Sequence, residues 1–193
     1  IIYNLFAINI IISKNVNIIH LLTENTINQI AAGEVIQRPS SVVKELMENS
    51  IDAKSKNIKV YIKDGGKTLI HVIDDGNGMN KTDAQTSFKR HATSKIKNAK
   101  DLFKIKTMGF RGEAMSSIAS ISHVEMQTKL NTEELGTKIF VEGGEIKSIK
   151  KCNCQKGTSI KIKNLFYNVP ARRKFLKTEK IEIKHITNEF IKI

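Results

Sequence analysis

Hydrophobic residues recur along this chain with two periods, and the longer period indicates helices. In residues 42–53, VVKELMENSIDA, apolar side chains return every three or four positions, which predicts a helix with one buried face. Ser40 or Ser41 could cap this helix just after Pro39, so we expect it to span residues 40–53. Shorter helices are expected at residues 23–32, 81–88 and about 113–120.

The shorter period is the alternation of β-strands. Residues 56–63 alternate apolar and polar side chains, and residues 69–73 form a more apolar run after a Gly65-Gly66 turn, so the two predict a hairpin. Further strands are expected at residues 18–22, 122–129, 136–142, 145–150 and 157–163. Because helices come first and most strands follow, the order favours an α+β fold, a two-layer α/β sandwich with a mixed, mostly antiparallel sheet and helices on one face.

Composition adds a possible partner. The chain has 193 residues, of which 40% are hydrophobic, enough for one domain with a real core. It carries 32 Lys and Arg against 19 Asp and Glu, a formal net charge of +13, which favours a polyanionic partner such as DNA. Because the lysines are spread along the whole chain, a lysine-rich solvated surface is the alternative.

The N-terminal segment and the cysteines have no assigned chemistry. Residues 1–22 are strongly apolar, but asparagines and Lys14 interrupt the run below the length of a membrane span. We leave residues 1–17 unassigned and expect one domain over residues 18–193. Cys152 and Cys154 form half a metal site at best, so we expect free thiols in a reducing compartment.

One face of the helix at residues 40–53 carries polar groups with catalytic potential. Glu45, Asn49 and Asp52 are spaced by four and three residues, so they share a face. Glu45 could take a proton from water as a general base, and the Asn49 amide oxygen could bind Mg²⁺, which prefers oxygen ligands. A solvated polar face is the alternative for this helix taken alone.

Two glycine-rich stretches could bind a nucleotide. In DDGNG, residues 74–78, Asp74 could accept a hydrogen bond from an exocyclic amine while the glycines let backbone approach a flat ring. In GFRGEA, residues 109–114, two glycines lead into a helix whose free N–H groups could bind phosphate. A hairpin turn and a helix start without a ligand are the respective alternatives.

Five stretches together resemble the MutL family of DNA mismatch-repair ATPases. They are QIAAGEVIQRPSSVVKELMENSIDA, IDDGNGM, RHATSKI, GFRGEA and LFYNVPARRKFL, and the resemblance runs from about Thr23 to the C-terminal end. It implies the Bergerat ATPase fold that this family shares with DNA gyrase, heat-shock chaperones and histidine kinases. GEVIQRP resembles the eukaryotic MLH branch, which implies a nuclear location. PARRKFLKTEK is as similar to bacterial MutL, so the cytoplasm of a bacterium or an organelle is the alternative.

The resemblance implies a role for each matching residue. Glu45 corresponds to the general base, Asn49 to the Mg²⁺ ligand and Asp74 to the acceptor for the adenine amine. The other implied nucleotide contacts are Gly78 beside the ring, Thr93, Ser94 and Lys95 in the lid, Gly109, Phe110, Arg111, Gly112, Glu113 and Ala114 in the phosphate loop, and Gly157 and Thr158, where a hydroxyl would support Asp74. We expect Asp52 to be structural.

The resemblance also implies what the protein does. ATP and Mg²⁺ would order a lid around residues 89–108, which would close two N-terminal domains on each other until slow hydrolysis releases them. Implied partners are DNA without sequence specificity, a MutS-type mismatch-recognition protein and a second MutL-type subunit. The family's next domain, of the S5-like fold, supplies a lysine to the γ-phosphate and lies outside this sequence. A truncated, non-catalytic DNA- or partner-binding module is therefore the alternative.

A basic cluster near the C-terminus is the candidate DNA site. It consists of Arg172, Arg173, Lys174 and Lys177 in PARRKFLKTEK. Such a cluster can neutralise phosphates without reading a sequence. A helix cap with a solvated face is the alternative.

Overall fold

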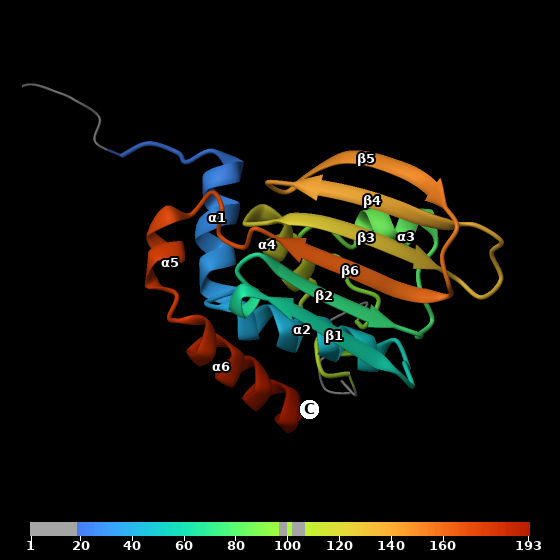
Figure 1. The fold of residues 1–193 in the computed structure, drawn as a ribbon. Coiled ribbons are helices and arrows are strands. Elements are labelled where there is room, and N and C mark those ends of the chain that lie inside the picture. The colour runs from blue at the N-terminus through green and yellow to red at the C-terminus, as the bar shows by residue number, and fades with distance from the viewer. Residues whose placement is uncertain (1–18, 97–99, 102–106) are drawn as a thin grey trace, which may run out of the picture.

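A six-stranded sheet with helices packed on one face forms the centre of the computed structural model, which describes residues 19–96, 100–101 and 107–193 (Figure 1). The helices are α1 (Glu24–Val35), α2 (Pro39–Asp52), α3 (Lys81–Thr86), α4 (Ala114–Ser120), α5 (Pro170–Phe175) and α6 (Glu179–Lys192). The strands are β1 (Ile58–Lys63), β2 (Leu69–Asp74), β3 (His123–Lys129), β4 (Gly136–Glu142), β5 (Glu145–Cys152) and β6 (Gly157–Lys163). The predicted α+β sandwich is confirmed, and so is the hairpin of β1 and β2.

The strand order is β1-β2-β6-β3-β4-β5. The last strand of the chain, β6, pairs with β2 on one side and with β3 on the other, so it joins two groups of strands that are consecutive in sequence. Within the described ranges each pairing between these strands is antiparallel, so the parallel part of the expected mixed sheet is not found there.

The core lies between the sheet and its helices. Alternation along the strands buries Ile70 and Val72 of β2 and Val124 and Met126 of β3 on the helix side. Helix α2 contributes the apolar stripe that the sequence predicts, namely Val42, Val43, Leu46 and Met47. Each such side chain contributes roughly 1.5–3 kcal/mol when buried, so the stripe holds α2 against the core and fixes the direction of its polar face.

The start of α2 differs from the prediction. The helix begins at Pro39 with Arg38 as its N-cap and no side-chain capping hydrogen bond, so the expected cap by Ser40 or Ser41 is wrong. Proline suits this first position because its φ is already near the helical value and it lacks an N–H that would need a partner. Ser40 is buried within the first turn.

The strand expected at residues 18–22 is wrong in its described part. Residues 19–22 are in neither helix nor strand, and the side chains of Ile19 and Leu21 are 94% and 99% exposed. The unassigned residues 1–17 lie outside the described residues, as do residues 97–99 and 102–106 of the expected lid. Within the described ranges, no helix is long and apolar enough to cross a bilayer.

Helices α5 and α6 were not predicted from the sequence. Helix α6 packs against α2 and against the short turn at Asp64–Gly66 that joins β1 to β2. Its Glu182 is fully buried, and one carboxylate oxygen accepts a hydrogen bond from the backbone N–H of Lys177 at 2.8 Å. This contact fixes the turn between α5 and α6.

Candidate nucleotide site

The polar face of α2 brings three side chains onto successive turns. Glu45, Asn49 and Asp52 lie beside the buried stripe, and Glu45 is partly buried. Burial raises the pKa of Glu45, and the nearby Glu48 carboxylate raises it further. Three cations act in the opposite direction on this pKa, namely Lys44, Lys95 and Arg111. A raised pKa moves a carboxylate toward the range in which a general base works best near neutral pH.

The lid segment, which we define as residues 92–96, lies against this face through Lys95. The Lys95 ammonium donates a hydrogen bond to Asn49 Oδ1 at 3.0 Å and forms an ion pair with Asp52. Burial alone would raise the pKa of Asp52, but the Lys95 contact and two backbone N–H donors lower it overall. These donors are Met108, at 3.0 Å, and Gly109, at 3.4 Å. Asp52 thus joins α2 to the lid segment and to the loop before α4, which is consistent with the structural role that we expect for it.

The lid segment also packs on the phosphate-loop segment, residues 109–114. Gly112 has a φ of +65°, and a Cβ at this position would lie 2.4 Å from the Ala92 carbonyl oxygen. The His91 ring lies 3.5 Å from the Glu113 carboxylate. The two motifs, RHATSK and GFRGEA, are therefore neighbours in space, on the same side as the polar face of α2.

Asp74 is the last residue of β2 and is 9% exposed. It accepts hydrogen bonds from the Ser50 hydroxyl at 3.1 Å, the Ser55 hydroxyl at 3.2 Å and the Gly76 N–H at 2.9 Å. Burial raises its pKa, although these hydrogen bonds oppose the shift. The carboxylate is thus held in one orientation by α2 and by the loop that follows α2.

The hydroxyl expected to support Asp74 is a different one. The Thr158 hydroxyl lies 3.1 Å from the Thr128 hydroxyl, whereas Ser50 and Ser55 supply the hydroxyls on Asp74. Thr158 acts on Asp74 through its backbone, which helps to lower the pKa of that carboxylate. Sequence reasoning missed both serines because Ser50 is 24 residues from Asp74 and only the packing of α2 on the sheet brings them together. Ser50, which directly follows Asn49 and falls on the buried side of α2, was the available signal.

Gly76 and Gly78 are required by packing within the protein. A Cβ on Gly76 would lie 2.6 Å from the Ser55 hydroxyl oxygen. Gly78 has a φ of +69°, and its Cβ would lie 2.1 Å from the Lys129 carbonyl oxygen. These glycines hold the DDGNG loop against the end of α2 and the end of β3, which places Asp74.

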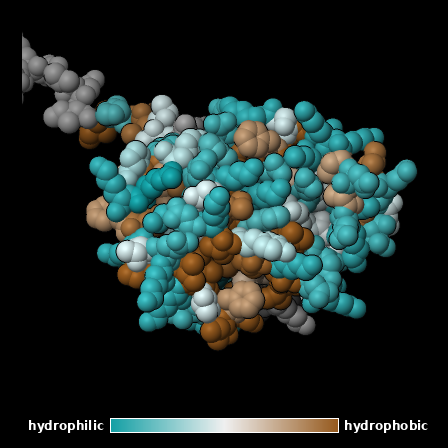
Figure 2. Space-filling model, in the orientation of Figure 1, coloured by the Kyte–Doolittle hydropathy of each residue, from teal (hydrophilic) through white to brown (hydrophobic). Residues whose placement is uncertain are grey.

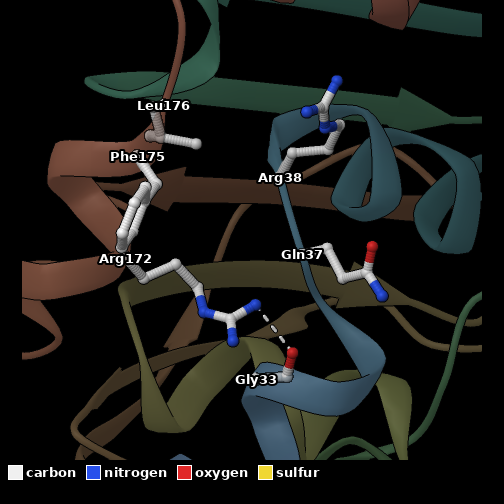
Figure 3. A pocket seen from close by; sticks show the side chains of 6 residues that line it. All are labelled: Gly33, Gln37, Arg38, Arg172, Phe175 and Leu176. Carbon is white, nitrogen blue, oxygen red and sulfur yellow. Dashed lines mark hydrogen bonds between the residues drawn. The ribbon is translucent and has the colours of Figure 1, made fainter.

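Arg172, which was predicted as part of the candidate DNA site, makes hydrogen bonds within the protein. Its guanidinium donates a hydrogen bond to the Gly33 carbonyl at 2.7 Å (Figure 3). It also donates to the Ile36 carbonyl at 3.4 Å and lies 5.9 Å from the Phe166 ring centre. The same guanidinium borders a cavity of about 300 Å³ between the end of α1 and α5. This cavity is lined by Gly33, Gln37, Arg38, Arg172, Phe175 and Leu176, and none of these is a predicted nucleotide contact.

The remaining predicted residues fall into three places. Thr93, Ser94 and Phe110 belong to the lid and phosphate-loop segments, where the Arg111 guanidinium lies 5.7 Å from the Phe110 ring centre and Ala114 begins α4. Arg173, Lys174 and Lys177 are exposed on and after α5.

Cys152 and Cys154 are free thiols, and burial raises the pKa of Cys152 to about 11. Among the described residues, no cluster of His, Cys, Asp or Glu could hold a metal ion by itself.

The donor set on α2 suits a nucleotide-bound cation. The Asn49 oxygen already faces a positive group, because the Lys95 ammonium lies against it. Oxygen ligands of this kind, with most of the coordination supplied by phosphates and water, are typical of Mg²⁺ sites. The buried carboxylate of Asp74, the carboxylate of Glu45 and the lid and phosphate-loop segments together could orient a purine nucleotide and a water molecule.

Comparisons with known proteins place the chain in the class of ATPases that the sequence motifs predicted. A family model described as "Histidine kinase-, DNA gyrase B-, and HSP90-like ATPase" matches residues 37–171. The chain belongs to this ATPase family. Within the family, its resemblance is to the DNA mismatch repair protein MutL, as the sequence motifs indicated.

Two bacterial relatives illustrate this resemblance. MutL of Christiangramia forsetii is 60% identical over 177 residues, which cover 92% of this chain and 29% of that protein. MutL of Bacteroides fragilis is 58% identical over 177 residues, with 92% and 28% covered. The chain thus spans less than a third of the length of these relatives. Both relatives are bacterial, so they do not support the nuclear location that the resemblance to the eukaryotic MLH branch implied.

Solved structures also match. The Aquifex aeolicus MutL ATPase domain complexed with ADP has a TM-score of 0.61 and 34% identity, covering 80% of this chain and 53% of that one. The N-terminal domain of a DNA repair protein has a TM-score of 0.70 and 32% identity, covering 88% and 49%.

Proposed function

We propose that this chain binds ATP with Mg²⁺ between the polar face of α2, the loop after β2 and the lid and phosphate-loop segments, and that it belongs to a slow ATPase. The observation that carries this proposal is the fixed, buried carboxylate of Asp74 beside a helix that presents Glu45 and Asn49. The ADP complex of the structurally similar MutL domain supports a nucleotide as the ligand.

Each residue would act on the nucleotide in a distinct way. Asp74 would accept a hydrogen bond from the adenine amine, and Asn49 would ligate the metal ion. Bound Mg²⁺ would supply positive charge next to the phosphate oxygens. Glu45 would take a proton from the attacking water, and its raised pKa suits this role. The backbone N–H groups of residues 109–114 would contact the phosphates.

In the longer protein, this ATPase would serve DNA mismatch repair in a bacterial cytoplasm. Nucleotide binding would order the lid and close two MutL-type subunits on each other, after a MutS-type protein has recognised the mismatch. Residues 18–193 would form the ATPase module, and a following domain would contribute to the γ-phosphate. DNA would contact exposed cations on and after α5, namely Arg173, Lys174 and Lys177. Arg172 is left out because its guanidinium is engaged with carbonyls at the end of α1.

Calorimetric binding of a non-hydrolysable ATP analogue to this chain tests the site. Asn49→Ala should weaken Mg²⁺-dependent binding by about tenfold or more, because it removes a metal ligand. Glu45→Ala should keep binding and, in the longer protein, lower hydrolysis by about 10²–10⁴-fold. Lys44→Ala, an exposed change on the same helix, is the matched control and should bind as the wild type does.

The outcomes separate the two functions. Equal loss of binding in Glu45→Ala and Asn49→Ala would show that Glu45 is structural. If the wild-type chain itself binds no analogue, the non-catalytic DNA- or partner-binding module describes this chain instead.

A further inference from the structure

A lysine of the lid segment lies on the helix face that carries the proposed metal ligand. The Lys95 ammonium is 3.0 Å from Asn49 Oδ1 and is ion-paired with Asp52 Oδ2. This pair is largely buried, since 17% of the Lys95 side chain and 8% of the Asp52 side chain are exposed. The contact is therefore a built part of the fold, unlike a surface ion pair whose side chains are free to separate.

The ammonium is also seated against the phosphate-loop segment. Asp52 accepts hydrogen bonds from the N–H groups of Met108 and Gly109, so it holds Lys95 and the start of this segment at once. A Cβ on Gly109 would lie 3.4 Å from Lys95 Nζ. Donors from the lid segment and from the loop before α4 thus converge on the Asp52 carboxylate of α2.

The ligands of the Lys95 ammonium are those that a divalent cation prefers. Amide and carboxylate oxygens suit Mg²⁺, and here the ammonium is in contact with one of each. The other charges nearby are Glu45, whose pKa Lys95 lowers, and Arg111, which acts on Glu45 in the same direction. A second cation at Asn49 would repel the ammonium strongly, because the site is screened little by water.

We propose that the Lys95 ammonium stands in for the divalent cation when no nucleotide is bound, and that entry of the metal with its nucleotide moves Lys95 off Asn49. The inference rests on the proposed function for the identity of Asn49 as a metal ligand. It makes Lys95 a positioning residue that keeps the α2 face neutralised and the lid segment attached in the empty state. Loss of this contact on metal entry would free the lid segment to rearrange.

Titration of Mn²⁺ into the nucleotide-free chain, followed by the paramagnetic resonance signal of free Mn²⁺, tests this proposal. Lys95→Met should bind Mn²⁺ about tenfold or more tightly than the wild type, which is the effect that one nearby charge has on an ionic equilibrium. Lys44→Met is the matched control: its ammonium pairs with Glu48 on the same helix at 3.7 Å, and its loss should leave Mn²⁺ affinity unchanged. Asn49→Ala added to Lys95→Met should abolish the gain.

A second variant keeps the test decisive if Lys95→Met unfolds. Lys95→Gln retains a hydrogen-bond donor for Asp52 without the positive charge, so it should also bind Mn²⁺ more tightly while thermal unfolding reports an intact fold. Unchanged Mn²⁺ affinity in a folded Lys95 variant overturns the proposal, and so does a gain that survives Asn49→Ala.

The result can be separated from the proposed function. Mn²⁺ binding is measured without nucleotide, whereas the proposed function is tested by binding of the ATP analogue to the wild type. If the wild type binds the analogue with Mg²⁺ and the Lys95 variants gain no Mn²⁺ affinity, the inference alone fails. If the variants gain Mn²⁺ affinity and the wild type binds no analogue, the proposed function alone fails.

Discussion

The carboxylate of Asp74 accepts hydrogen bonds from the Gly76 N–H and from two hydroxyls that are remote in the sequence. The position of Asp74 at the end of a strand followed by glycines could be predicted, because the apolar run and the loop residues are adjacent in the chain. The partners Ser50 and Ser55 could not, since they come from the end of α2 and the loop after it. Local patterns place a side chain on an element, and only the packing of elements chooses its neighbours.

The same reasoning explains the two glycines of GFRGEA. The sequence predicts a role for both, but the structure separates them, because only Gly112 combines a positive φ with backbone contact to Ala92. We expect Gly112→Ala to lower the free energy of unfolding by about 2 kcal/mol, the cost of a strained φ in a non-glycine residue. Gly109→Ala is the control and should change it by less than about 0.5 kcal/mol, as its Cβ would meet only the end of Lys95. Urea unfolding measures both, and equal effects would contradict this account.

Among the elements, α2 and the six strands of the sheet were predicted, whereas α5 and α6 were not. The apolar stripe of α2 has a clear helical period, and each predicted strand from residue 122 onward lies within two residues of an observed one. Helix α6 also has apolar residues at helical spacing, namely Ile183, Ile186 and Phe190, but of these only Ile186 is buried, and the helix buries the charged residue Glu182 with it. A buried acid among exposed apolar residues weakens the helical signal of the sequence. Its position depends instead on contacts with α2 and with the turn between β1 and β2.

Helix α5 is attached to α1 by the contact that removes Arg172 from the basic cluster. We expect Arg172→Met to lower the free energy of unfolding by about 1–3 kcal/mol, because two carbonyls at the end of α1 lose their donor. Arg173→Met, an exposed neighbour, should change it by less than about 0.5 kcal/mol. Thermal unfolding of the two variants measures both changes in the free energy of unfolding. A similar effect of both would mean that the contact in Figure 3 contributes nothing.

Across the whole molecule, the formal net charge is +13. Hydrophilic residues cover most of the face that Figure 2 shows, which is the outer face of the sheet. On this face Glu125 lies within 3.3–4.0 Å of the ammonium groups of Lys138, Lys161 and Lys163. Because one carboxylate cannot neutralise three lysines, the sheet face also keeps positive charge. The total charge therefore does not show which surface contacts DNA.

The salt dependence of DNA binding can identify it. If Arg173 and Lys174 contact phosphates, replacing both with alanine should reduce the slope of log affinity against log salt by about two, one for each lost contact. Replacing Lys150 and Lys151, which are exposed on β5, removes the same charge and should leave the slope almost unchanged. An equal reduction in both pairs would assign DNA binding to diffuse charge and not to α5.

The place of β6 in the sheet has a consequence for synthesis of the protein. β6 is the last of the six strands of this sheet to be synthesised, yet it pairs with β2 through Asp74↔Thr158 and with β3 through Thr128↔Thr158. Until β6 has emerged, the strands before it form two separate groups with unpaired edges, β1-β2 and β3-β4-β5. Such non-local pairing slows folding and leaves edges exposed while translation continues. The two groups of strands are therefore joined into one sheet in a single late event, and a pause in translation before residue 163 would prolong the period in which the chain is prone to aggregate.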